Sequence, residues 1–266
     1  MNRVTIPNTN FTCSKFIFGT SGHLSILNKQ KRQYLFNMAV DNNFSHFDTS
    51  PYYGFGLAEK ELKDILKNKD LTVTSKVCLY PSGGSDQKFS EMFFRKSFGK
   101  LYRPLSKPII NFTIDEATKS LEGSLRRLGR DCIDILLIHE PIIEHLNCEE
   151  WQKWFYDIIK SGKIKYNGIS SLNIHRLEKF ILKNNITINI IQSPDSIESF
   201  EADFLKKYNL PMQITFGYMS SYKKKNILNS FNEIFSQIAK RNPHGPIIVS
   251  ARSVKHLSEI SNLINK

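Results

Sequence analysis

The sequence of 266 residues has no long apolar run. No stretch approaches the roughly 20 consecutive apolar residues that a helix needs to cross a bilayer. The first ten residues, MNRVTIPNTN, lack the apolar segment typical of a signal peptide. We therefore expect a protein of the cytoplasm that has no membrane partner.

Cysteine is scarce and scattered, at Cys13, Cys78, Cys132 and Cys148. The chain contains no C-x-x-C motif and no histidine pair at metal-binding spacing. These absences argue against a zinc site and against a disulfide framework. We expect no bound metal and a reducing compartment.

Long runs of one charge are also missing, although the formal net charge is +12. A basic protein can bind nucleic acids, membrane surfaces or small anions. The lysines are spread along the chain, and the longest basic run covers only residues 223–225. This distribution favours a solvated basic surface, and no nucleic-acid partner is expected.

What the chain does contain is typical of a globular protein, with 40% hydrophobic and 12% aromatic residues. A length of 266 residues fits one large α/β barrel or two ordinary domains. We favour one barrel domain over residues 1–266.

Apolar runs and helical periodicity alternate along the chain. A short hairpin is expected at residues 4–12. The predicted strands are residues 16–18, 44–48, 71–76, 132–138, 165–169, 188–191, 212–216 and 247–249. The predicted helices are residues 29–41, 57–68, 113–128, 149–161, 173–183, 196–208, 227–241 and 254–264. Residues 80–111 interrupt this rhythm and are expected to form a long loop, which in a compact domain is often functional.

Eight strands that are each followed by a helix predict a (β/α)8 TIM barrel. A doubly wound sheet is the alternative, and it would normally carry G-x-G-x-x-G after its first strand. That motif is missing there. In a barrel, functional residues lie at the carboxyl ends of the strands. The residues at these ends are Gly19, Thr20, Asp48, Tyr53, Lys76, His139, Ser170, Ser171, Gln192, Phe216 and residues 250–253.

Residues 47–59, FDTSPYYGFGLAE, resemble the D-T-A-x-x-Y-G-x-G-x-x-E signature of the aldo-keto reductases, with Ser50 in place of Ala. The segments SLRRLGRDCIDILLIHEP and GKIKYNGISS are similar to further segments of that family, and the resemblance covers almost the whole chain. It implies a catalytic tetrad, which consists of Asp48, Tyr53, Lys76 and His139.

Carbonyl reduction explains why these four residue types belong together. A hydride that reaches a carbonyl carbon leaves negative charge on the oxygen, which a donor must protonate or stabilise. The resemblance implies that Tyr53 gives the proton and that Asp48 orients Lys76. We expect the Lys76 ammonium to lower the pKa of Tyr53 by about 1 to 3 units. A neutral His139 would donate a second hydrogen bond to the same oxygen.

The resemblance also implies a nicotinamide dinucleotide as the cofactor, lying across the barrel mouth; we expect NADP(H), and NAD(H) is the alternative. The residues expected to bind it are Gly19, Thr20, Asp48, Ser170, Ser171, Gln192, Phe216, Ser250, Arg252, Ser253 and His256. Ser171 and Ser250 replace an Asn and a Gly of the family pattern, and Ile260 replaces the Asn often found at the adenine. Arg252 and His256 beside a helix N-terminus suit a 2′-phosphate. The alternative is a plain basic helix start.

The function that follows is an NADPH-dependent oxidoreductase that reduces a small-molecule aldehyde or ketone, with a sugar or sugar derivative among the candidates. The alternative is a catalytically silent NADP(H)-binding sensor or partner subunit. The oligomeric state and the closure of the substrate pocket are left open.

Overall fold

A computed structural model of the chain describes residues 2–87, 89–98, 107–183, 185–219 and 231–264. Eight parallel strands close into a barrel in chain order, as the sequence predicts. They are β3 (Phe16–Gly19), β4 (His46–Asp48), β5 (Thr72–Val77), β8 (Ile133–His139), β9 (Ile164–Ser170), β10 (Ile190–Pro194), β11 (Ile214–Phe216) and β12 (Ile247–Val249). The barrel closes where Ile247 of β12 pairs with Phe16 of β3.

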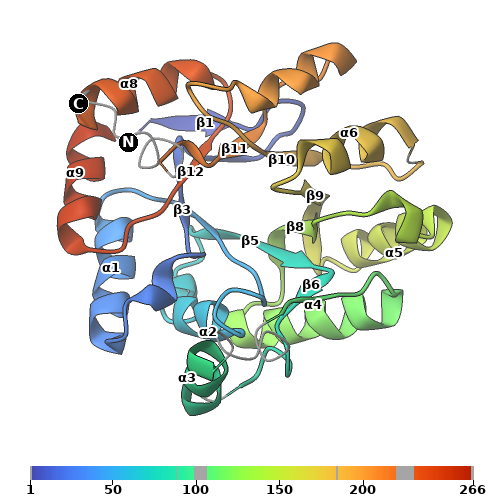
Figure 1. The fold of residues 1–266 in the computed structure, drawn as a ribbon, viewed down its shortest axis with the longest axis horizontal. Coiled ribbons are helices and arrows are strands. Elements are labelled where there is room, and N and C mark those ends of the chain that lie inside the picture. The colour runs from blue at the N-terminus through green and yellow to red at the C-terminus, as the bar shows by residue number, and fades with distance from the viewer. Residues whose placement is uncertain (1, 88, 99–106, 184, 220–230, 265–266) are drawn as a thin grey trace.

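Helices surround the barrel (Figure 1). They are α1 (Lys29–Asp41), α2 (Leu57–Leu62), α4 (Ile114–Leu128), α5 (Cys148–Lys160), α6 (Ile174–Lys183), α8 (Phe231–Arg241) and α9 (Val254–Ile264). Their apolar faces and the outward side chains of the strands form one large core. No helix in the described part of the chain is both long and apolar enough to span a bilayer.

Two predicted helices differ in form. The helix expected at residues 57–68 is α2 followed by a 3-10 turn, Ile65–Lys67. The helix expected at 196–208 is a 3-10 helix, Glu201–Tyr208. Phe200 precedes it with a φ of 51°, and the hydroxyl of Ser196 accepts the Ser199 amide at 3.1 Å. A side chain that takes up backbone donors in this way competes with the start of a helix.

The sequence predicts a loop at residues 80–111, and this prediction is wrong in part. Strand β6 (Leu79–Tyr80) pairs antiparallel with β7 (Ile109–Ile110), so the ends of the segment are joined by a small ladder. Helix α3 (Phe89–Phe98) lies between them, at the bottom of Figure 1. Residues 88 and 99–106 of this segment fall outside the described residues.

The predicted N-terminal hairpin is present as β1 (Arg3–Thr5) paired with β2 (Thr12–Ser14). Its residues Ile6, Phe11 and Cys13 are buried in a cluster with the inward side chains of the barrel. The cluster is completed by Ile17, Ile135, Leu137, Ile190 and Ile214. This apolar tier fills the amino-terminal half of the barrel, which leaves the carboxyl ends of the strands for polar side chains.

Candidate active site at the barrel mouth

Two strand ends supply a buried ion pair. Asp48 ends β4 and Lys76 lies near the end of β5, and the side chains of both are almost fully buried. The Lys76 ammonium donates to the two carboxylate oxygens of Asp48 at 2.7 and 2.8 Å. Its third hydrogen bond goes to the Thr49 carbonyl at 2.9 Å. All three donors of Lys76 are therefore used, which a buried ammonium requires.

Tyr53 lies beside this pair, on the loop after β4. The Lys76 ammonium is 5.0 Å from the centroid of its ring, a cation-π distance. The ring of His139 meets the Tyr53 ring edge-on, with centroids 6.1 Å apart at 88°. The turn that places Tyr53 has three successive residues in the left-handed region, from Gly54 (φ 61°) to Gly56 (φ 83°). The structure thus brings together the four residues predicted as the tetrad.

The pKa of Tyr53 departs from expectation. Burial raises this pKa well above its usual value of 10, and the negative charges of Asp48 and Glu140 raise it further. The expected net lowering of the Tyr53 pKa is wrong, because burial, Asp48 and Glu140 outweigh any contribution of the Lys76 charge. The ammonium donates its hydrogen bonds to Asp48 and Thr49 and faces the ring instead of bonding the phenol oxygen. Tyr53 is consequently a neutral phenol at physiological pH.

The charge states of Lys76 and His139 follow from the same burial. Burial lowers the pKa of Lys76, and Asp48 offsets part of that effect. Burial and the Lys76 charge hold the pKa of His139 well below 6.5, so this ring is neutral. Its Nδ1 has no hydrogen-bond partner in the described part of the chain. A neutral imidazole at the end of β8 is consistent with the predicted hydrogen-bonding role.

A chain of polar side chains continues from Asp48 to the neighbouring strand ends. The Gln192 amide of β10 donates to Asp48 Oδ2 at 2.8 Å. Its own oxygen accepts the hydroxyl of Ser170, the last residue of β9, at 2.5 Å. Ser170 and Gln192, predicted to hold the cofactor, are thus hydrogen-bonded to each other and to the tetrad.

Ser171 has a different partner. Its hydroxyl donates to Glu140 at 2.6 Å and accepts the Asn173 amide at 2.9 Å. Glu140 follows His139 directly and has a φ of 56°, a conformation that costs a side-chain-bearing residue about 1 to 3 kcal/mol. Sequence reasoning missed Glu140. The available signal was an acidic residue immediately after the histidine of a buried strand.

Gly19, Thr20 and Phe216 shape the mouth on the side of β3 and β11. A Cβ at Gly19 would lie 2.7 Å from Ser250 Oγ and from Ile248 Cγ2, so the close packing there requires glycine. The Thr20 hydroxyl donates to the Asp48 carbonyl at 3.0 Å. Phe216 ends β11, half-buried, and its carbonyl accepts the amide of Asp195 at 2.8 Å.

The residues predicted to bind phosphate gather at the start of α9. The Ser253 hydroxyl accepts the His256 amide at 3.2 Å, which is N-terminal capping geometry. Arg252 is exposed and packs against Gly22 of the loop after β3, because a Cβ at Gly22 would lie 2.9 Å from its Nε. Strand β12 and the loop after β3 therefore place a guanidinium beside a helix N-terminus.

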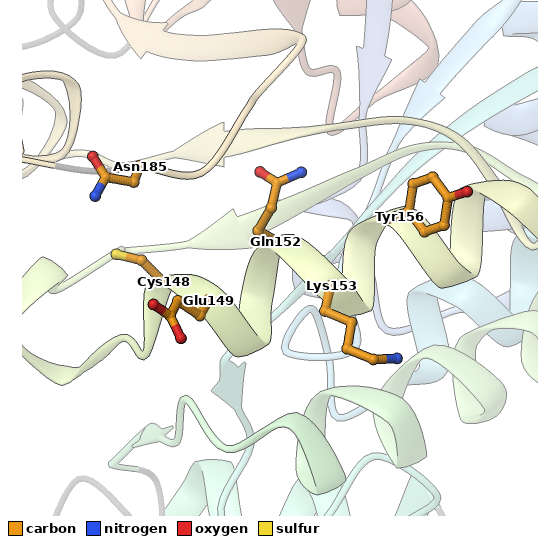
Figure 2. A pocket seen from close by; sticks show the side chains of 6 residues that line it. All are labelled: Cys148, Glu149, Gln152, Lys153, Tyr156 and Asn185. Carbon is orange, nitrogen blue, oxygen red and sulfur yellow. The ribbon is translucent and has the colours of Figure 1, made fainter.

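Two clefts on the surface of the described residues lie away from Tyr53. A cleft of about 460 Å³ runs along the outer side of α5, with Cys148, Gln152 and Tyr156 on the helix and Asn185 across from them (Figure 2). A smaller one of about 250 Å³ lies between the loop after β8 and the start of α6. Neither contains a tetrad residue. The described residues hold no cluster of three metal-ligating side chains.

Comparisons with known proteins agree with this architecture. The family model described as "Aldo/keto reductase family" matches residues 15–201, well over half of the chain. Aldo-keto reductase YhdN of Bacillus subtilis is 26% identical over 148 residues, which are 53% of this chain and 37% of the relative. Aldo-keto reductase yakc [NADP(+)] of Schizosaccharomyces pombe is 24% identical over 196 residues, 73% of this chain and 51% of the relative. The chain thus spans about half or less of these relatives' length.

Solved structures show the same fold at low identity. The glycerol dehydrogenase AKR11B4 from Gluconobacter oxydans superposes with a TM-score of 0.73 and 17% identity, over 98% of this chain and 89% of that one. The holo form of aldo-keto reductase AKR11C1 from Bacillus halodurans gives 0.73 and 16%, over 100% and 91%. The match of the family model, together with this barrel, shows that the chain belongs to the aldo-keto reductase family.

Proposed function

We propose that the protein reduces an aldehyde or ketone with NADPH and that Tyr53 gives the proton. The observation that supports this most strongly is the buried Lys76–Asp48 pair beneath the Tyr53 ring, with neutral His139 at its edge. A buried ion pair is not needed for stability, because well-packed apolar residues often serve as well or better. Its position at a barrel mouth therefore favours a chemical role.

Tyr53 and His139 would act on the substrate oxygen, and Asp48 and Lys76 would support Tyr53. When bound, the cofactor supplies the hydride that adds to the carbonyl carbon. Tyr53 would transfer its proton to the oxygen as charge develops there, and neutral His139 would donate a hydrogen bond to it. Asp48 keeps Lys76 charged in a buried place, and that ammonium would then stabilise the phenolate left on Tyr53.

The residues present fit a nicotinamide dinucleotide. Ser170 and Gln192 are buried polar groups suited to a carboxamide, and Phe216 ends the neighbouring strand opposite Pro194, two residues beyond Gln192. Arg252 and the N-terminus of α9 combine a guanidinium with the positive end of a helix dipole, which favours a phosphate dianion. The name of the Schizosaccharomyces pombe relative specifies NADP(+), in line with this choice.

For the substrate, we propose a small-molecule carbonyl compound, with sugars and sugar derivatives as the first candidates. This proposal rests on the SPYYGFGLAE sequence around Tyr53. Tyr52, whose ring centroid is 6.5 Å from that of Tyr53, would form part of the substrate wall.

A catalytically silent NADP(H)-binding sensor is the second candidate. The engagement of Ser171 with Glu140 favours it, because that hydroxyl's proton is committed and cannot go to the cofactor. Ile260, at a position where many family members have Asn, is fully buried among apolar side chains. Both features reduce the polar contacts available to a dinucleotide.

Two measurements on the same sample separate these candidates. Calorimetric titration with NADPH tests binding, and NADPH oxidation with a panel of aldehydes, ketoses and sugar derivatives tests turnover. Binding with turnover supports the reductase. Binding without turnover across the panel supports the sensor, and no binding of NADPH would contradict both.

A further inference from the structure

The Glu140 carboxylate accepts three hydrogen bonds, from two residues of the turn after β9 and from one residue of α6. Its Oε2 accepts the Ser171 hydroxyl at 2.6 Å and the Arg176 guanidinium at 3.0 Å. Its Oε1 accepts the backbone amide of Leu172 at 2.7 Å. The side chain is 13% exposed, so these bonds form largely out of water. One carboxylate thus joins the end of β8 to the turn after β9 and to the first turn of α6.

The backbone around Glu140 is arranged to direct this side chain. The φ of 56° would suit glycine, yet a glutamate occupies the position. The Glu140 amide donates to the Ser170 carbonyl at 2.7 Å, next to the side-chain contacts. A strained conformation that several bonds hold in place, beside a proposed active site, points to a role for the carboxylate.

The three bonds change what the neighbouring residues can do. A hydroxyl has a single proton, and Ser171 gives it to Glu140, so Ser171 cannot donate to a carboxamide oxygen. Leu172 is 75% exposed at the barrel mouth, and its amide bond to Glu140 fixes that part of the turn. Ser170, directly before, keeps its bond to Gln192.

We propose that Glu140 is a positioning residue of this site, which fixes the turn of residues 170–172 through its carboxylate and holds Ser171 away from the cofactor. The proposal rests on the proposed function for its effect on NADPH. The nicotinamide carboxamide would then donate to Ser170 Oγ, whose own proton goes to Gln192, and accept from the second N–H of Gln192, while Ser171 acts through Glu140.

The first test uses the protein without cofactor. Glu140→Gly suits the observed φ and removes the carboxylate, so the side-chain bonds are lost without added backbone strain. Glu144→Gly is the matched control, because Glu144 lies in the same loop with an exposed partner, Lys179, at 3.3 Å. We expect amide exchange at Leu172 to rise at least about tenfold in Glu140→Gly and to stay within about twofold of wild type in the control. Wild-type exchange in Glu140→Gly would overturn the proposal.

The second test is a double-mutant cycle on NADPH affinity, measured by calorimetry. Glu140→Gly and Ser171→Ala are each expected to weaken binding about five- to tenfold, and together no more than the stronger single variant, because both remove the bond between Ser171 and Glu140. Ser171→Thr keeps a hydroxyl and is expected to bind within about twofold of wild type.

Effects that multiply would mean that Ser171 contacts the cofactor independently, which would overturn the proposal. A wild-type protein that fails to bind NADPH would instead contradict the proposed function. In that case the exchange rate at Leu172 still decides whether Glu140 fixes the turn.

Discussion

The hydroxyl of Tyr53 is expected to act in the chemical step and to contribute little to cofactor binding. Tyr53→Phe is expected to reduce kcat at least about 100-fold, because general acid catalysis contributes that much or more. The affinity for NADPH should stay within a few-fold, since the hydroxyl acts on the developing alkoxide. Steady-state kinetics and calorimetry give the two numbers. Tyr156→Phe, an exposed ring on α5, is the control and should retain kcat within about threefold. Turnover above a tenth of wild type in Tyr53→Phe would remove it from the acid role.

The pH dependence follows from the burial of the site. The pKa of His139 lies well below 6.5, so its neutral form persists through the neutral range. The pKa of Tyr53 is raised above 10, and that of Lys76 is lowered from 10.5. We expect kcat/KM to be flat from about pH 6.5 through neutrality and to fall on the alkaline side as Lys76 loses its proton, before Tyr53 ionises. An acid limb centred near 6.5 would contradict this assignment for His139.

At this scale the residue types at the strand ends could be predicted, and their charge states only in part. Sequence order indicated which side chains reach the mouth, and the structure brings Asp48, Tyr53, Lys76 and His139 together. The raised pKa of Tyr53 comes first from burial and then from the charges of Asp48 and Glu140, which no local pattern encodes. The bond between Ser171 and Glu140 joins two residues 31 positions apart, each directly after a strand, and could not be predicted for the same reason.

The turn after β4 depends on the segment after β5. Gly56 has a φ of 83°, and a Cβ there would lie 1.7 Å from the Ser85 carbonyl oxygen. Gly84 has a φ of 86°, and a Cβ added there would meet no atom of the described residues within 4 Å. Gly84 therefore provides a control for backbone strain alone. Gly84→Ala should cost about 1 to 2 kcal/mol of unfolding free energy.

Gly56→Ala should cost more than Gly84→Ala in urea denaturation, because the Ser85 backbone must also move. It should also lower kcat, since Tyr53 is three residues away on the same turn. Equal costs for the two variants would show that the contact with Ser85 contributes nothing to stability.

The strength of the periodic signal determined which elements could be predicted. Helix α1 at Lys29–Asp41, β12 at Ile247–Val249 and α9 at Val254–Ile264 match their predicted bounds. The residues of the 3-10 helix Glu201–Tyr208 have helical periodicity. The Ser196 hydroxyl accepts the Ser199 amide and the Asp195 carboxylate accepts the Ala202 amide, so the predicted helix does not begin at Ser196. Strands β6 and β7 are two residues each and pair across about 30 residues, so no run of alternating residues indicates them.

Cofactor choice is a property of the whole barrel, because Arg252 of the last βα unit lies against Gly22 of the first. Arg252→Ala should weaken NADPH about 10- to 150-fold, the effect of losing one charge-assisted bond to the 2′-phosphate. NADH affinity should hardly change. Arg126→Ala, an exposed arginine paired with Asp86, controls for the lost positive charge. Equal loss for both cofactors would mean that Arg252 holds the pyrophosphate or the fold.

The barrel itself was predictable because the alternation of strand and helix persists over the whole chain. The function of the basic surface could not be predicted, because a protein with a net charge of +12 can bind several kinds of anion. The packing of Arg252 against Gly22 could not be predicted, because it requires β12 to lie beside β3.

Transfer of deuterium from NADPH that carries deuterium in place of both hydrogens at C4 tests most directly whether this barrel mouth reduces carbonyl groups. With a panel compound that supports NADPH oxidation, mass spectrometry of the alcohol product is expected to find one deuterium on the former carbonyl carbon for each NADPH consumed. Tyr53→Phe should give almost none in the same time. NADPH oxidation without deuterium in the product, or tight NADPH binding with no transfer to any carbonyl, would contradict the proposed reduction.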